Sequence, residues 1–193
     1  MPKTGAGDTA YFLTPHSGNV ENVALAGLLG SLVVDYAARQ KSSRMKYFVV
    51  EQLPILPPKA LSAEPVWMGN SVGCWLSERA LELCYTNEEM RYLALDLGRE
   101  LAPFQWCTKR RIVLQAELDA AVMHLYGLDR AQSEWLIDSF AVLRKYEERD
   151  HGEFRTKRIV LEIYDEMATA RSNGIVYQTR LDPPPADERC CHA

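Results

Sequence analysis

The chain has 193 residues, of which 47% are hydrophobic and 25% are charged, a composition typical of one globular domain or two small ones. The longest apolar run, from Val23 to Leu29, is far shorter than the roughly 20 residues that span a bilayer, so we expect no membrane segment. The 22 Lys and Arg against 26 Asp and Glu leave a net charge of -4, which excludes a protein that binds nucleic acid through a uniformly basic surface. Any DNA contact must therefore be local.

The N-terminal sequence and the cysteines predict a cytoplasmic location. No charged segment followed by an apolar segment opens the sequence, so no secretion signal is expected. The cysteines are odd in number and lack C-x-x-C spacing, which suits a reducing compartment better than a disulfide framework. They are Cys74, Cys84, Cys107, Cys190 and Cys191.

The first 58 residues are predicted to hold an extended lead-in, one helix and one strand. Residues 1–19 show no periodicity and form the lead-in. Apolar residues three to four apart predict a single helix over 22–39, in which Gly27 and Gly30 allow another backbone to approach closely. The β-branched and aromatic run 47–50 predicts a strand, and the proline-rich stretch 53–58 predicts an extended segment with a domain boundary near its end.

The next residues are predicted to be helical. One helix is expected from about residue 71 or 75 to 85, and a capping-box pattern from Thr86 to Glu89 opens another that stops at Gly98. Thr108 is expected to cap the best-defined helix, which Gly127 ends. The apolar stripe of that helix is Ile112, Leu114, Leu118, Val122 and Leu125.

Two more helices are predicted, over 129–140 and 154–171. In the first, Trp135, Leu136 and Phe140 are expected to point inward. A short strand is possible at 175–177, before a proline run. The predicted fold class is α+β, mainly α, with a lead-in at 1–19, a helix-strand unit at 20–58, a helical domain at 59–172 and a flexible tail at 173–193.

Motifs for catalysis and cofactor binding are absent from the sequence. It contains no phosphate-binding loop, no dinucleotide fingerprint and no nucleophile elbow, and its histidines lack metal-ligand spacing. Cys190, Cys191 and His192 are expected to lie in the flexible tail, and Asp119 and His124 are expected on a solvated surface. We therefore predict no catalytic, cofactor-binding or metal-binding residue.

Residues 150–158 contain acidic side chains followed by basic ones. Asp150 and Glu153 precede Lys157 as at a helix entry, where the macrodipole favours acids without any chemistry. Arg155, Lys157 and Arg158 are expected to pair with Glu153, Glu162 or other neighbours. A solvated helix face is the favoured interpretation.

Two basic clusters are the candidates for binding phosphate. Three cations and two hydroxyls between Lys41 and Lys46 suit phosphate oxygens, although a plain solvated turn is equally consistent with them. The run 109–111 lies in the first turn of its helix, where cations oppose the macrodipole, and this local cost indicates another use. The candidate DNA-binding residues are Lys41, Ser43, Arg44, Lys46, Lys109, Arg110 and Arg111.

An ordered series of sequence blocks over roughly residues 20–170 resembles the C-terminal region of large bacterial adenine-specific DNA methyltransferases. These are the type IIG fusion enzymes of restriction-modification systems and their BREX and DISARM relatives in phage defence. Two blocks resemble the end of a target-recognition domain, ALAGLLGSLVVDY at 24–36 and YFVVEQLPILPP at 47–58. The others resemble the helical region that follows, RALELCYT at 79–86, FQW at 104–106, RR at 110–111 with AELDA at 116–120, HLYGL at 124–128 and GEFRTKR at 152–158.

The resemblance implies a non-catalytic DNA-recognition and scaffold segment. The family's Asn-Pro-Pro-Tyr motif and S-adenosylmethionine loop are missing here, so the chain alone is not expected to methylate DNA. The cofactor would bind only in a catalytic domain supplied in cis or in trans. The alternative is a helical protein-interaction module of a defence complex without DNA contact, and a stand-alone enzyme is a third reading. The first two differ in whether the two basic clusters share one face.

Overall fold

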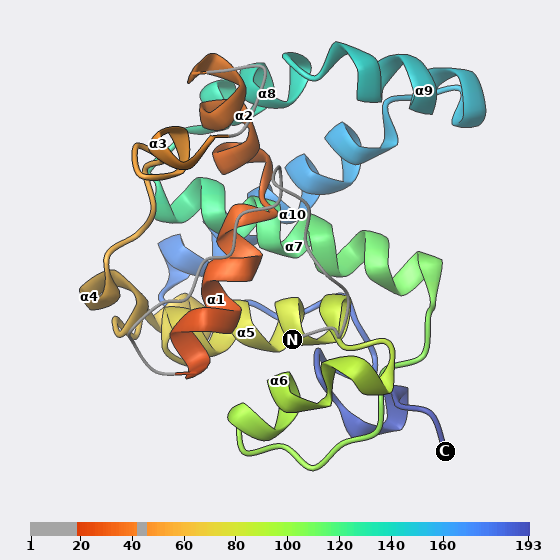
Figure 1. Ribbon diagram of the computed structural model, residues 1–193. Coiled ribbons are helices and arrows are strands. Elements are labelled where there is room, and N and C mark those ends of the chain that lie inside the picture. Colours follow the sequence, from red (N-terminus) through yellow and green to blue (C-terminus); the bar gives the residue numbers. More distant parts are fainter. Residues whose placement is uncertain (1–18, 42–45) are drawn as a thin grey trace.

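The structure is a computed structural model that describes residues 19–41 and 46–193. Within these ranges the chain is mainly α, and no strand is present (Figure 1). The α-helices are α1 (Asn19–Leu29), α2 (Leu32–Lys41), α3 (Tyr47–Val50), α4 (Pro58–Leu61), α5 (Val72–Cys84), α6 (Arg91–Asp96), α7 (Thr108–Leu125), α8 (Arg130–Asp138), α9 (Ala141–His151) and α10 (Arg155–Asn173). Three short 3-10 helices are η1 (Val66–Met68), η2 (Glu88–Met90) and η3 (Glu188–Cys190).

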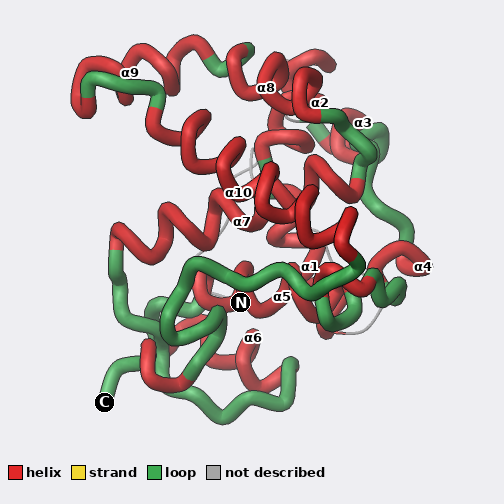
Figure 2. Tube along the Cα trace, turned by 180° about the vertical axis from the view of Figure 1, so that it is seen from behind, coloured by secondary structure: helices red, strands yellow, loops and turns green. Residues whose placement is uncertain are grey.

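Helices α7 and α10 lie side by side at the centre of the molecule (Figures 1 and 2). Helix α5 packs against α7, and α1 packs along α5. Helices α8 and α9 gather at one end of α10, whereas α6 and the C-terminal end of the chain lie below α5 in Figure 1. No single described helix is long and apolar enough to cross a membrane, and only α1 and α2 taken together, across a 63° bend, reach that length and composition.

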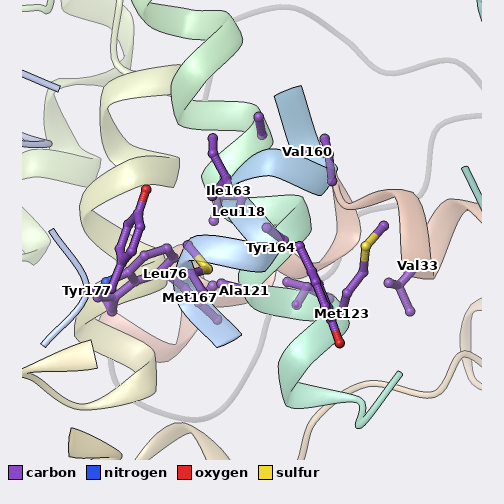
Figure 3. Close-up of a cluster of buried hydrophobic side chains, with 14 of the residues drawn as sticks. Val33, Leu76, Leu118, Ala121, Met123, Val160, Ile163, Tyr164, Met167 and Tyr177 are labelled. Atoms are coloured by element: carbon purple, nitrogen blue, oxygen red, sulfur yellow. The ribbon is translucent and has the colours of Figure 1, made fainter. Parts of the chain in front are cut away.

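One main core runs through the whole described chain. It joins Ala24, Leu28 and Val33 from the first helices to residues between Leu61 and Tyr177. Residues of the predicted helix-strand unit at 20–58 thus contribute to this core, and a smaller buried cluster of Val34, Ala38 and Leu53 lies within the unit. Part of the core is drawn in Figure 3, with Val33, Leu76, Leu118, Ala121, Met123, Val160, Ile163, Tyr164, Met167 and Tyr177 labelled.

Gly27 brings α1 close to α5, as its sequence position predicts. A Cβ atom at this position would lie 3.3 Å from the Ala80 Cβ atom and 3.7 Å from the Leu76 carbonyl oxygen. Only a residue without a side chain fits such an approach without displacing a neighbour. The helix over 22–39, however, is not continuous, because the chain breaks at Gly30 and Ser31 and turns by 63° into α2.

The strands predicted at 47–50 and 175–177 are wrong. Residues 47–50 form the short helix α3, in which the Val49 and Val50 amides donate to the Lys46 carbonyl oxygen. Tyr177 is in an irregular segment and its amide donates to the Trp67 carbonyl oxygen in η1. A strand needs a neighbouring strand for its hydrogen bonds, and the described chain provides none, so β propensity is overridden here.

Most of the predicted helix ends are correct. Ser71 caps α5, Asp129 caps α8 in a full capping box, and α10 ends at Gly174 with a left-handed φ of 62°. The capping box predicted from Thr86 to Glu89 does not form; instead the Asn87 side chain accepts from the Glu89 amide and opens η2. Thr108 does not cap α7 either, because Cys107 is the N-cap residue and makes no side-chain hydrogen bond there.

Helix α9 is absent from the sequence-based expectation, and α8 is shorter than predicted. Helix α8 ends at Asp138, and α9 begins only three residues later. Leu136 and Phe140 are buried as expected, but Trp135 is 62% exposed. The buried face of α8 carries Ser133, Leu136 and Ile137, so Trp135 lies to one side of it and only touches Tyr36 edge to face at 5.6 Å.

The segment 173–193, expected to be a flexible tail, packs against α5 and α7. Tyr177, Leu181 and Ala186 are buried in it. A backbone bridge joins Cys191 to Phe104, and the His192 amide donates to the Pro103 carbonyl oxygen. Many of the polar contacts that hold this segment come from α5 and α7, far away in sequence, and local composition gives no sign of them.

Candidate functional site

The first basic cluster lies where α2 ends and α3 begins. Lys41 is exposed, and its ammonium group donates to the Gln52 side-chain oxygen at 3.3 Å. Lys46 is exposed just before α3. Ser43 and Arg44 lie outside the described residues. The described part of this cluster is thus on the surface, where it can reach a partner.

The second basic cluster is largely occupied by contacts within the chain. Lys109 is exposed, but Arg110 pairs through two nitrogens with the Glu82 carboxylate and donates to the carbonyl oxygens of Pro183 and Pro184. The Arg110 side chain is 12% exposed. Its role is to fasten the C-terminal segment to α5 and α7, which leaves little of it for DNA.

Arg111 covers an aromatic ring. Its guanidinium lies 3.8 Å from the centre of the Trp106 ring and donates to the Leu83 carbonyl oxygen at 3.0 Å. Stacking of this kind is typical of arginine, whose planar group is weakly hydrated. The exposed cation of the run 109–111 is therefore Lys109.

The two clusters lie at opposite ends of α7. Lys41 contacts Gln52, and two residues further on the Pro54 carbonyl oxygen accepts from the Tyr126 hydroxyl, just past the C-terminal end of α7. Lys109 lies in the first turn of the same helix. An 18-residue helix is about 27 Å long, so the clusters do not form one continuous basic face.

Exposed aromatic side chains accompany the first cluster. Tyr47 and Phe48 of α3 are 56% and 55% exposed, and Trp135 of α8 is 62% exposed. Helix α2 lies between α3 and α8 and contacts both (Figure 1). We call this region the α2–α3–α8 surface; large exposed aromatic residues beside cations are typical of interaction surfaces.

A buried ion pair joins α5 to α7, and no local sequence pattern indicates it. The Arg79 and Glu117 side chains are 4% and 0% exposed and lie 2.7 Å apart. Arg79 also stacks at 3.3 Å on the Trp75 ring, and burial lowers the pKa of its guanidinium. The Glu117 carboxylate also accepts three hydrogen bonds from the C-terminal segment, donated by the Tyr177 hydroxyl, the Thr179 hydroxyl and the Arg180 amide.

Asp119 and His124 are buried, which corrects the expectation of a solvated surface. His124 stacks on Tyr164 at 3.9 Å, and its Nδ1 accepts from Arg171, so the other ring nitrogen carries the proton and donates to the Tyr164 carbonyl oxygen. Burial lowers the pKa of this imidazole and keeps it neutral. Its role is structural.

Asp119 holds the break between α1 and α2. Its carboxylate accepts from the Leu32 amide at 2.8 Å, while Gln115 donates to both Asp119 and the Gly30 carbonyl oxygen. Burial raises the pKa of Asp119 from 3.8 to about 7, against the opposing effect of these hydrogen bonds. A buried acid in α7 thus caps a helix that precedes it by more than eighty residues.

The raised pKa predicts how stability depends on pH. Between pH 3.8 and about 7 the folded chain keeps a proton on Asp119 that the unfolded chain releases, so this group's contribution to stability falls as the pH rises through about 7. Asp119→Asn removes the titration while keeping an acceptor for Leu32. The variant should gain stability relative to the native chain between pH 5 and pH 8, as measured by urea unfolding. Glu64→Gln, at an exposed position, is the control; a difference between Asp119→Asn and the native chain that does not change with pH would contradict the assignment.

The other charged groups singled out in the sequence mostly form surface ion pairs. Arg158 binds Glu153 and Glu162 as expected. Lys157 binds Glu134 and Asp138 of α8. Among the residues that the structure describes, no group of three or more His, Cys, Asp or Glu side chains is arranged to hold a metal ion.

Comparison with known proteins finds no family model, no curated protein and no solved structure that matches the chain. Function is therefore inferred from the residues of this chain and from the resemblance of its sequence blocks.

Proposed function

We propose that this chain is a non-catalytic scaffold segment of a DNA adenine methyltransferase of a restriction-modification or phage-defence system. S-adenosylmethionine and methyl transfer would belong to a separate catalytic domain. The sequence blocks at 24–36, 47–58 and 79–158 support the family, and the α2–α3–α8 surface supports docking. The catalytic domain is the proposed occupant of that surface.

The observation that supports the scaffold role is that arginine side chains form ion pairs within the chain. Arg79, which is buried, and Arg110, which is half-buried, pair with carboxylates and tie α5, α7 and the C-terminal segment together. Cations used in this way stabilise a rigid support and do not line a nucleic-acid groove. Exposed aromatic residues on α3 and α8 then provide the contact area that a protein partner needs.

Local DNA contact is the second part of this proposal, and it is restricted to the first cluster. Lys41 and Lys46 are exposed beside the aromatic residues, whereas Arg110 is committed to Glu82. Phosphate contacts of this kind position a protein on the duplex and carry no sequence information. The competing candidate, a protein-interaction module without DNA contact, uses the same aromatic surface, and the separation of the two basic clusters along α7 favours it.

A titration with labelled duplex DNA at low salt separates the two candidates. The chain should bind weakly and without sequence preference, and Lys41→Glu with Lys46→Glu should abolish most of the binding. Each lysine that contacts a phosphate adds about 0.9 to the slope of log affinity against log salt. Lys109→Glu is the matched control and should bind normally. Absence of binding by the native chain favours the module without DNA contact, and an equal loss in the control contradicts the restriction of DNA contact to the first cluster.

Docking is tested with the purified catalytic domain of the candidate methyltransferase. The two should co-elute from a sizing column, and Phe48→Asp with Trp135→Asp should separate them. Tyr146→Asp, an exposed aromatic position on α9, is the control that should leave the complex intact. Co-elution that survives the changes at Phe48 and Trp135 would place the catalytic domain elsewhere and overturn the docking surface.

A further inference from the structure

A pocket of about 280 Å³ opens between the N-terminal halves of α7 and α10. Trp106 lies at its rim, Ile112 and Ile159 form part of its apolar wall, and Arg111 and Arg155 also line it. Trp106 is 66% exposed, so the pocket is reached from solvent. The pocket plays no part in the proposed scaffold role.

The two arginines in this pocket differ from most others in the described chain, where Arg171, which donates to His124, is the one other arginine without a carboxylate partner. Arg111 and Arg155 form no ion pair with a carboxylate among the described residues, and the Nε atom of Arg155 is buried there without a hydrogen-bond partner. The described arginines that do pair with a carboxylate are Arg39, Arg79, Arg91, Arg99, Arg110, Arg130, Arg144, Arg149, Arg158, Arg180 and Arg189. A buried donor without a partner costs free energy, which a bound acceptor would recover.

The acids of the pocket already have partners. Glu147 of α9 accepts from the amide and the hydroxyl of Thr156, each at 2.7 Å. Asp119 accepts from Leu32 and Gln115. Unused hydrogen-bonding capacity in this pocket is therefore concentrated on the guanidinium groups, and a ligand must supply acceptor atoms to satisfy it.

The dipoles of the two long helices, α7 and α10, both place their positive ends at this pocket. Residues of the first halves of α7 and α10 line the pocket, and further along both helices His124 stacks on Tyr164, so the two helices run in the same direction. Their positive N-terminal ends both face the pocket region; the Glu147 carboxylate already accepts from the Thr156 amide at the start of α10, whereas α7 has no acid in its first turn. Cations in these turns oppose the helix dipoles, and a bound anion would relieve this repulsion.

We propose that this pocket binds a small ligand made of a single planar ring with one carboxylate or phosphate group. The anionic group would lie between Arg111 and Arg155, because a guanidinium offers paired donors that match such oxygens. The ring would lie against Ile112, Ile159 and the exposed Trp106. A single ring suits a volume of about 280 Å³, which is at the lower end of the range for ligand pockets.

The test uses benzoate and phenyl phosphate as probes, with benzamide as the neutral analogue and inorganic phosphate as the ringless one. Binding is followed by Trp106 fluorescence in a Trp135→Phe background, which removes the other exposed tryptophan. At least one anionic ring should change the emission with saturation, whereas benzamide and inorganic phosphate should bind at least tenfold more weakly. Stronger binding by benzoate or by phenyl phosphate identifies the anion.

Variants and an independent measurement make the result decisive. Arg111→Gln and Arg155→Gln should each weaken binding at least tenfold, while Arg149→Gln, an exposed arginine paired with Asp150, should not. Amide shifts in the nuclear magnetic resonance spectrum of the native chain should map to residues around Ile112 and Thr156 without any substitution. Equal binding of benzamide, shifts elsewhere, or no binding of either anionic ring overturns the proposal.

Discussion

Glu117→Ala is expected to lower the free energy of unfolding by about 3–5 kcal/mol, because it leaves the Arg79 guanidinium buried without its counter-charge. The substitution also removes the acceptor used by Tyr177 and Thr179. Urea unfolding followed by circular dichroism measures the effect. The loss should exceed that of any single surface ion pair in the chain.

Two further variants separate the buried charge from other effects. Glu166→Ala breaks only the exposed pair with Arg180 and should change stability by about 0–1 kcal/mol. Arg79→Met combined with Glu117→Leu removes both charges and should cost less than the sum of the single changes. Additive losses would show that the two side chains act independently and that the ion pair is not what stabilises this contact.

Leu118→Ala should cost about 2–5 kcal/mol, since it opens a cavity between packed helices. Leu118 is 1% exposed, lies in α7, and its side chain faces Gly27 of α1. Trp135→Ala is the matched comparison, because this larger residue is 62% exposed and should cost much less. Thermal melting of both variants decides the point, and a greater loss for Trp135→Ala would reverse the burial assigned to these helices.

The helices were predictable wherever the signal is local. Gly127, with a left-handed φ of 70°, follows the end of α7, and α8 has Asp129 with a glutamine three residues later in its capping box. The stripe predicted for α7 is not distinct, because residues 116–124 are buried on every side of that helix. Periodicity and capping depend on residues a few positions apart, so the sequence alone reveals them. The strand predicted at 47–50 failed because β propensity records side-chain shape, while a strand exists only if another strand pairs with it.

The candidate sites were less predictable, because their chemistry depends on residues distant in sequence. Arg110 lies in a basic run whose composition suits phosphate contacts, but in the structure it binds Glu82, which is 28 residues away in sequence. The sequence around Asp119 and His124 does not indicate that they are buried, because the helices that enclose them come from other parts of the chain. Arg155 illustrates the same limit, because only the structure places it in one pocket with Arg111.

The attachment of the C-terminal segment affects the order in which the chain can fold as it is synthesised. Glu82 and Glu117 leave the ribosome long before Ala186 and Tyr177, which supply their remaining hydrogen bonds. The helices can form early from local contacts, but these long-range contacts wait until residues 177–186 have been synthesised. Until then the nascent chain exposes two incompletely partnered carboxylates and the apolar surface that the segment covers. Docking of residues 177–186, and not formation of the helices, is therefore the step that completes these contacts.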